Sequence, residues 1–358
     1  MIKDLNFGGS FCVLPWIEKF HYFNGHTKLC CWSEKFLESE QQAELIRNEI
    51  WNRKPVSHCE TCYKLEQDKT ISPRQRESVA WLKDDTVKNL FNTNLCPQKS
   101  TLFLDLRLEN KCNLACISCN PKDSSLWAKE LNIEIIKSKI SINYNDFSTL
   151  KKIYICGGEP FLIKEYYDII RFVAEKHPNI EIVVNTNLTV LPDDLINSIK
   201  KINKFTLVVS IDAFGSVNEY HRYPLKWSKF IHNLERVKEL GITVQFNTVV
   251  DAISIFGLGQ LSTMDHIPDY WTLTILEKPD WLLLENIPVH LKEEANNQLI
   301  EFFTNNFYKT DVVFKTVIEL IKKQIMQSGD SSLLIEQIKN IDSRRKINHK
   351  DYLGFNLF

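Results

Sequence analysis

The stretch TLFLDLRLENKCNLACISC, residues 101–119, joins an apolar, β-favouring run to three closely spaced cysteines. Its first part, Thr101–Leu108, predicts a β-strand, and Cys112, Cys116 and Cys119 follow in the spacing C-x3-C-x2-C. Three thiolates do not complete a tetrahedral zinc site without a fourth ligand, so a zinc half-site is one interpretation. They suit a 4Fe–4S cluster with one iron left open to a substrate or cofactor, which is the interpretation we favour.

Further β-favouring runs follow this stretch, and amphipathic segments separate several of them. The runs are Lys152–Cys156, Ile180–Asn185, Phe205–Ile211, Thr243–Val250 and Trp271–Leu276. The amphipathic segments, which predict helices, are Ser124–Ile140, Lys164–His177, Leu195–Ile202 and Lys226–Leu240. This alternation predicts an α/β fold with parallel strands, either a partial barrel or an open doubly wound sheet. In both, ligands bind at the carboxyl ends of the strands, where the cysteine loop lies.

Composition divides the chain of 358 residues into four regions. Residues 1–70 are rich in cysteine and aromatic side chains, and residues 71–100 are polar and predict a helical connector. The strand–helix alternation occupies residues 101–285, and residues 286–358 predict a helical C-terminal tail rich in Lys and Glu. We therefore expect a barrel domain with a small module before it and helices after it.

Charge and hydropathy give no clear signal for nucleic acid or for a membrane as a partner. The chain has 44 Lys and Arg against 45 Asp and Glu, so no global field draws it to nucleic acid or anionic lipid. It has no run of about 18 apolar residues and no apolar N-terminal signal, so we expect a cytoplasmic protein without a membrane span. All ten cysteines lie between Cys12 and Cys156, and in a reducing compartment they predict metal ligation, not disulfides.

The cysteine loop resembles the cluster-binding loop of the radical S-adenosylmethionine (SAM) superfamily. The segment Gly157-Gly158-Glu159-Pro160, which follows the second predicted strand, looks like the GGEP motif with which that family binds the amino group of SAM. Glycines allow close backbone approach and a carboxylate suits an ammonium group, although a Gly-Gly pair alone is typical of an ordinary turn. Cys156, directly before the motif, is expected to be a small buried residue and not a ligand.

Weaker matches to the same family follow the later strands. Ser210 and Asp212 look like its ribose-contacting S-x-D motif, and Arg222 stands where related enzymes carry an arginine for the SAM carboxylate. Asn187 is a plausible additional polar contact. The alternative interpretations are that Ser210 and Asp212 cap a turn and that Arg222 is a surface salt-bridge partner.

The resemblance implies a fold, cofactors and a reaction. The fold is a partial (β/α)6 barrel, and the cofactors are a 4Fe–4S cluster and SAM, whose amino and carboxylate groups chelate the open iron. Reductive cleavage of SAM then gives a 5′-deoxyadenosyl radical that abstracts hydrogen from a substrate, here of unknown class: peptide, sugar or nucleoside. An electron donor such as flavodoxin or ferredoxin is the implied partner.

The N-terminal cysteines are similar to the first part of the SPASM/twitch modules that hold auxiliary Fe–S clusters in such enzymes. The resemblance implies one auxiliary 4Fe–4S cluster bound by Cys12, Cys30, Cys59 and Cys62, with the thiolate of Cys30 placed by a hairpin at Gly25. In most relatives this module follows the barrel, and the cysteines of a second auxiliary cluster are missing here. Two alternatives stay open: Cys31 in place of Cys30, and a structural zinc with four cysteine ligands. Cys96 is unassigned.

A second class of function is a non-enzymatic Fe–S or zinc scaffold that binds a partner. The intact GGEP segment argues against it, because a scaffold does not need a SAM pocket.

Overall fold

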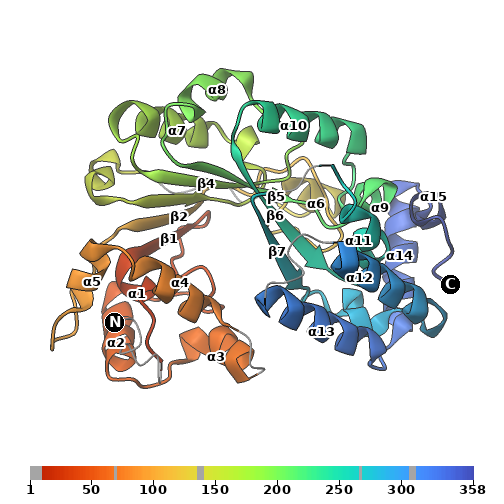
Figure 1. Ribbon diagram of the computed structural model, residues 1–358, viewed down its shortest axis with the longest axis horizontal. Helices are drawn as coiled ribbons and strands as arrows, with labels where there is room; N and C mark the ends of the chain where they lie inside the picture. Colours follow the sequence, from red (N-terminus) through yellow and green to blue (C-terminus); the bar gives the residue numbers. More distant parts are fainter. Residues whose placement is uncertain (1–9, 68–70, 135–140, 266–267, 306–311) are drawn as a thin grey trace.

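Seven parallel strands in sequence order form the central sheet of the computed structural model (Figure 1). The structure describes residues 10–67, 71–134, 141–265, 268–305 and 312–358 of the chain. The strands are β1 (Glu18–Tyr22), β2 (Phe103–Arg107), β3 (Lys152–Ile155), β4 (Glu181–Thr186), β5 (Phe205–Ser210), β6 (Thr243–Val250) and β7 (Tyr270–Ile275). Each strand pairs with the next, and the described residues form no pairing between β1 and β7, so the barrel is partial.

The six strands predicted from the sequence are β2 to β7, and their bounds agree within two residues. The first strand, β1, lies in the N-terminal region and was not predicted. It pairs in register with β2, with Glu18 opposite Phe103 and Tyr22 opposite Arg107. The N-terminal region therefore adds a seventh strand to the edge of the six-stranded partial barrel.

Crossover helices cover the outer face of this sheet, where α7, α8 and α10 lie side by side in Figure 1. On α7 the buried side chains Tyr166, Ile169, Ile170 and Val173 fall on one face, as the 3.6-residue spacing predicts. The predicted helix Ser124–Ile140 is shorter than expected, because α6 ends at Glu130 and residues 135–140 lie outside the described residues. The helices between the strands are α6 (Ser125–Glu130), α7 (Lys164–Lys176), α8 (Asp193–Ile199), α9 (Gly215–His221), α10 (Trp227–Glu239) and α11 (Leu258–Leu261).

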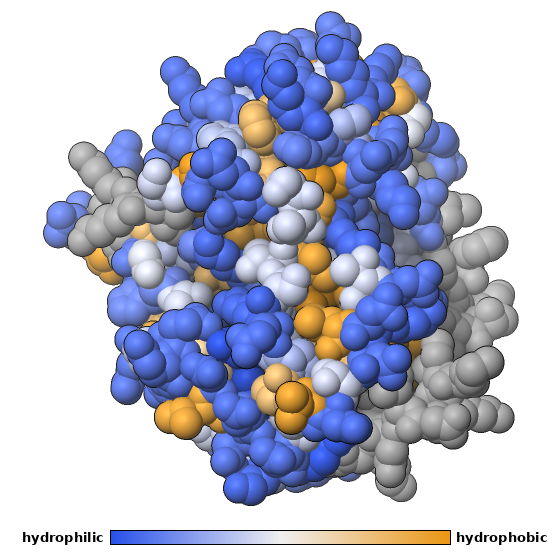
Figure 2. All heavy atoms as spheres, turned by 90° about the vertical axis from the view of Figure 1, so that its left-hand side faces the viewer, coloured by the Kyte–Doolittle hydropathy of each residue, from blue (hydrophilic) through white to orange (hydrophobic). Residues whose placement is uncertain are grey.

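The N-terminal region has a hydrophobic core of its own. Buried side chains such as Phe11, Val13 and Trp16 pack together there, and Phe103 of β2 joins the same cluster. The region contains α1 (Leu14–Ile17), α2 (Glu40–Trp51) and α3 (Glu60–Gln67), and the predicted helical connector forms α4 (Pro73–Trp81) and α5 (Asp85–Phe91). The side of the molecule on which these helices lie is mostly hydrophilic, with small scattered hydrophobic areas (Figure 2).

The C-terminal region is helical, as predicted, and packs on the barrel. It consists of α12 (Lys292–Asn305), α13 (Val312–Met326), α14 (Ser331–Arg345) and α15 (His349–Leu353). Tyr220 of α9 donates a hydrogen bond to Asp342 of α14 at 2.8 Å, which ties this region to the helix after β5. None of the described helices is long and apolar enough to cross a membrane. Short 3-10 helices occupy Ser57–Cys59, Tyr144–Thr149, Pro160–Leu162, Ser254–Gly257, Asp280–Leu282, Leu284–Asn286 and Val289–Leu291.

Candidate cluster and cofactor site

The three-cysteine loop lies at the carboxyl end of β2, where the fold class places ligands. Carbonyl groups at the end of α9 and just after it accept hydrogen bonds from the backbone of this loop. The amide of Ala115 donates to the carbonyl of Tyr223 at 2.6 Å. The amide of Ile117 donates to the carbonyl of His221 at 2.8 Å. These backbone bonds fix the loop between Cys112 and Cys119 without using the cysteine side chains.

The three thiols are half-buried, and polar groups face two of them. Asn187 Nδ2 lies 3.9 Å from the sulfur of Cys112, and Arg222 Nη1 lies 3.9 Å from the sulfur of Cys116. Burial raises the pKa of Cys112 to about 12 and also raises the pKa of Cys116, although Arg222 opposes the second shift. Thiolates at these positions therefore need a bound cation, as iron in a cluster supplies.

The two glycines of the GGEP segment touch the backbone of the cysteine loop. Gly157 and Gly158 have φ of +87° and +51°, a region that L side chains rarely adopt. A Cβ on Gly158 would lie 2.2 Å from the carbonyl oxygen of Lys111. The next amide, that of Glu159, donates to the same oxygen at 2.7 Å. The segment and the residues that lead into the cysteine loop are therefore in direct backbone contact.

The carboxylate of Glu159 is fully buried and already bound by protein groups. Thr186 Oγ1 and the amide of Asn187 each donate to it at 2.7 Å, and the amide of Phe161 donates at 3.1 Å. Burial raises the pKa of Glu159 to about 7, against the effect of these hydrogen bonds. This carboxylate therefore holds the loop after β4 in place. Its predicted direct contact with an ammonium group stays a prediction.

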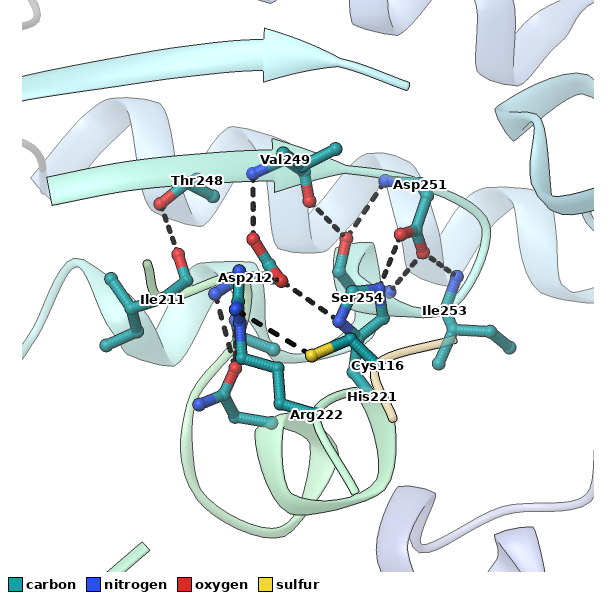
Figure 3. Close-up of polar contacts among 12 residues, drawn as sticks. Cys116, Ile211, Asp212, His221, Arg222, Thr248, Val249, Asp251, Ile253 and Ser254 are labelled. Atoms are coloured by element: carbon teal, nitrogen blue, oxygen red, sulfur yellow. Dashed lines mark hydrogen bonds and ion pairs between the residues drawn. The ribbon is translucent and has the colours of Figure 1, made fainter. Parts of the chain in front are cut away.

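A buried charge network follows β5 and β6 (Figure 3). Asp212 lies 2.7 Å from Arg222 Nη2 and 3.0 Å from His221 Nδ1, and His221 Nε2 lies 2.6 Å from Asp251. Asp212 also accepts the amide of Val249 at 2.9 Å. Arg222 is therefore a buried residue that joins Asp212 to Cys116, which contradicts the alternative of a surface salt bridge.

The charges of this network hold each other in the ionised form. Burial works against ionisation of Asp212, but Arg222 and His221 hold the pKa of that carboxyl well below its usual range. Burial would also lower the pKa of His221, but Asp251 and Asp212 outweigh it and raise the pKa to about 9. Asp212 accepts the amide of Val249 on β6, whereas the amide of Phe214 in the following turn donates to the carbonyl of Gly257, so the described hydrogen bonds do not make Asp212 the cap of that turn.

The remaining predicted polar contacts lie along the same edge of the sheet. Ser210 is half-buried and donates to Asn185 Oδ1 at 3.2 Å. Asn185 in turn donates to the sulfur of Cys156 at 3.4 Å, and this thiol is half-buried, not fully buried as expected. Asn187 donates to Asn113 of the cysteine loop at 3.1 Å. The structure thus brings the predicted side chains to the carboxyl ends of β2 to β5.

The four predicted auxiliary cysteines line one small cavity in the N-terminal region. Cys12, Cys30, Cys59 and Cys62 are all buried, and Trp32, His58 and Arg74 complete the wall with Leu14 and Pro15. Cys31 lies elsewhere, beside Glu18 and Asp105. The geometry therefore favours Cys30 over Cys31 as the fourth sulfur of this cavity. The turn at Gly25, with φ of +82°, is present, but Cys30 follows it in a bend and not on a strand.

Sulfur spacing bears on the zinc alternative at both cysteine sites. Zinc–sulfur bonds of about 2.3 Å in a tetrahedron place sulfur atoms about 3.8 Å apart. Among the described residues, the one set of three His, Cys, Asp or Glu ligand atoms within 4.8 Å of one another is Glu18, Cys31 and Asp105. In neither predicted cysteine set do three sulfur atoms lie within 4.8 Å of one another.

Sequence reasoning missed residues that reach the site from distant parts of the chain. Arg345 of α14 donates to the carbonyl of Ala115 at 2.7 Å and to Glu130 at 3.1 Å, and its guanidinium lies 4.7 Å from the ring centre of Trp127. No local pattern points to Arg345. His221 directly precedes the predicted Arg222 in the sequence, and this adjacency is the signal from which its place in the site could have been predicted.

Comparisons with known proteins agree with this geometry. Residues 107–256, which include the cysteine loop, the GGEP segment and the Asp212 network, match the family model of the radical SAM superfamily. The GTP 3′,8-cyclase of Campylobacter lari is 27% identical over 157 residues, 41% of this chain and 46% of that protein. The GTP 3′,8-cyclase of Clostridium perfringens is 26% identical over 215 residues, 56% of this chain and 61% of that protein.

The chain thus spans about half the length of the curated relatives it matches. Among solved structures, native anSMEcpe with bound AdoMet aligns with a TM-score of 0.43 and 16% identity over 63% of each chain. Streptococcus suis SuiB bound to S-adenosylmethionine aligns with a TM-score of 0.41 and 15% identity, over 75% of this chain and 65% of that chain. The part of this chain that matches the radical SAM superfamily model, residues 107–256, is the part that contains the strands and loops of the site.

Proposed function

We propose that the protein is a radical SAM enzyme that holds a 4Fe–4S cluster through Cys112, Cys116 and Cys119. The observation that carries this proposal is the contact of Gly158 and Glu159 with the carbonyl of Lys111, which joins the cysteine loop and the GGEP segment into one site. When bound, the cluster and SAM supply one-electron chemistry, namely reductive cleavage of SAM and abstraction of a hydrogen atom from a substrate.

The side chains around the cluster bind and orient the cofactor. Arg222 brings a cation beside Cys116, where it offsets thiolate charge and faces the expected position of the SAM carboxylate. Asp212 also positions Arg222, since its carboxylate pairs with that guanidinium and with His221. The ribose contact predicted for Ser210 and Asp212 is retained as part of the proposal, as are the contacts of Asn187 and the GGEP segment.

The N-terminal cavity is the proposed site of one auxiliary 4Fe–4S cluster bound by Cys12, Cys30, Cys59 and Cys62. Four buried cysteines on one cavity support it. With four protein ligands such a cluster has no open iron, so its role is electron transfer or structural support. The chain is therefore proposed to be a twitch-like radical SAM protein with its auxiliary module before the barrel.

The substrate is proposed at the level of class: a peptide, a sugar or a nucleoside. The similarity to GTP 3′,8-cyclases covers 41% and 56% of this chain, so it supports the barrel chemistry more than a particular substrate. A cytoplasmic electron donor such as flavodoxin or ferredoxin would reduce the cluster. A non-enzymatic scaffold would not need the close backbone contact between Gly158 of the GGEP segment and Lys111 before the cysteine loop.

The test is formation of 5′-deoxyadenosine by the anaerobically reconstituted full chain with SAM and dithionite. Replacing any one of Cys112, Cys116 or Cys119 by Ala should abolish it, because an iron loses its protein anchor. Cys96→Ala is the matched control, since Cys96 is half-buried and lies in neither cysteine set. A wild-type protein that holds its clusters but forms no 5′-deoxyadenosine would overturn the proposal.

A further inference from the structure

Glu18, Cys31 and Asp105 form a set of three ligand side chains where the N-terminal region joins the barrel sheet. Glu18 begins β1 and Asp105 lies in β2, opposite Phe20, so both carboxyl groups point to the same face of the paired strands. Cys31 comes from the chain after the Gly25 turn, and its amide donates to Glu18 Oε1 at 3.0 Å. One ligand atom of each residue lies within 4.8 Å of the other two.

The two carboxyl groups are buried and incompletely paired. Glu18 is 2% exposed and Asp105 is 0% exposed. Glu18 Oε2 and Asp105 Oδ2 are both buried and have no hydrogen-bond partner in the protein. A buried carboxylate oxygen that has no hydrogen-bond partner destabilises the fold, so a cation or a proton between the two oxygens would stabilise this arrangement.

Protein cations balance the set only in part. Arg107 Nε lies 3.4 Å from Asp105 Oδ1, and its guanidinium also faces the ring of Phe20 at 5.2 Å. Burial, and then the neighbouring Asp105, raise the pKa of Glu18 well above its usual range. Burial also raises the pKa of Asp105. Arg107 therefore faces three groups that would each carry a negative charge when ionised, and the half-buried Lys28 is a second cation whose charge acts on Asp105.

One thiolate and two carboxylates are a ligand set that zinc accepts. Zinc binds Cys sulfur and Asp or Glu oxygen in tetrahedral sites, and three protein ligands leave one position for water. A divalent cation together with Arg107 would neutralise the three ionised ligands. Cys31 is free for this role because Cys30, not Cys31, lines the four-cysteine cavity.

We propose that Glu18, Cys31 and Asp105 bind one zinc ion, separate from both cysteine sets. The ion fastens the loop that carries Cys30 and Cys31 to strands β1 and β2, and thereby joins the N-terminal region to the barrel. The site does not depend on SAM cleavage, so it stands or falls separately from the proposed function.

The experiment uses the full chain, reconstituted anaerobically with iron and sulfide so that both cysteine sets are filled first. One equivalent of zinc is then added, the protein is desalted, and bound zinc is measured by mass spectrometry and by X-ray absorption at the zinc edge. We expect about one zinc per chain, with one sulfur at about 2.3 Å and oxygens at about 2.0–2.2 Å.

Variants test the ligands one at a time. Glu18→Gln, Asp105→Asn and Cys31→Ser should each retain almost no zinc, because each leaves two ligands. Cys96→Ser controls for loss of a cysteine outside the site, and Asp146→Asn for loss of an exposed carboxylate that pairs with Lys19 of β1. Both controls should retain zinc like the wild type.

Three results would overturn the proposal: no retained zinc, retention that is unchanged in Glu18→Gln, or a zinc shell made only of sulfur. The first would show that the two carboxyl groups are kept neutral by protons. The last would place the zinc among the cysteines of another site. Since the ligand shell is measured on the wild type, it decides the question even if a variant does not fold.

Discussion

At the level of one residue, the surroundings of Gly158 explain why this position of the GGEP segment requires glycine. Its φ of +51° favours glycine, and an added Cβ would lie 2.2 Å from the carbonyl oxygen of Lys111, which is backbone and cannot rotate away. Gly157 is less constrained, with its nearest neighbour, Arg107 Cβ, at 3.2 Å. The position of the cysteine loop relative to β3 therefore depends on Gly158.

Replacing Gly158 by Ala should damage the site through this contact. The left-handed backbone costs about 1–2 kcal/mol, and the clash with Lys111 adds displacement of the cysteine loop, so 5′-deoxyadenosine formation should fall about tenfold or more. Iron content and the rate of product formation measure the effect.

Gly241→Ala is the matched control, because Gly241 also has a positive φ, of +67°, but an added Cβ meets nothing within 4 Å. It should lose some stability and keep the activity of the wild type. Equal loss of activity in the two variants would mean that backbone strain, not contact with the loop, is responsible.

At the level of elements, the strands that could be predicted are those whose apolar residues are continuous or alternate along the chain. Strands β2, β4 and β5 are buried on both faces for much of their length, so the sequence shows them as apolar runs. Strands β3, β6 and β7 instead alternate buried and less buried positions, which gives the period of two expected for a strand. The run Glu18–Tyr22, EKFHY, places three polar residues among five and joins the sheet only through its pairing with β2. That pairing is a contact between residues 85 apart, which no local pattern contains.

The candidate site follows the same rule. The cysteine spacing and the GGEP segment are contiguous, and so the sequence alone identified them. The bond from Asp251 to His221 joins the loop after β6 to the end of α9, and the bond from Arg345 to Ala115 joins residues 230 apart. Such partners come from tertiary packing and become visible only in the structure.

The two cysteine sets belong to different elements, and this separates their expected roles. Cys12 precedes β1, whereas Cys112 follows the carboxyl end of β2, and the two strands run parallel. Replacing Cys59 and Cys62 together by Ala should therefore lower iron from about eight to about four per chain and leave the SAM-binding cluster. EPR of the reduced variant should still change when SAM is added.

The matched comparison is the pair Cys112→Ala and Cys116→Ala, which should keep about four irons but lose the SAM response. If the variant with both Cys59→Ala and Cys62→Ala is folded but its remaining EPR signal does not change when SAM is added, the two cysteine sets have been assigned the wrong way round. Insolubility is a risk, because a cluster in the module contributes to its folding. Cys59→Ser alone, with the same EPR measurement, then provides the milder test.

At the scale of the whole molecule, helix α14 of the C-terminal region packs against the cysteine loop. Arg345 is 9% exposed, and it contacts the carbonyl of Ala115, the carboxylate of Glu130 and the faces of Trp127 and Tyr223. Its guanidinium uses different nitrogens for Ala115 and Glu130, which a lysine ammonium does not reproduce. The tail therefore supports a loop that lies more than two hundred residues earlier in the chain.

Arg345→Lys should make the barrel cluster more labile. Because the loop loses its support at Ala115, we expect iron to be removed by a chelator several-fold faster, followed by the loss of Fe–S absorbance. Arg344→Lys is the control, since Arg344 also contacts Glu130, at 3.3 Å, but has no bond to the loop among its described contacts. Identical rates for both variants and the wild type would show that the tail does not support the loop.

Strand β1 belongs to the N-terminal region in sequence and to the barrel in space, which limits how the chain can be truncated. A fragment that begins at residue 101 would leave β2 as an exposed edge, with unpaired N–H and C=O groups and with Leu102 and Phe103 uncovered. Bare edges of this kind pair with other chains and lead to aggregation. The compositional border near residue 100 is therefore not a place where the protein can be cut, and a shorter soluble version has to begin before Glu18.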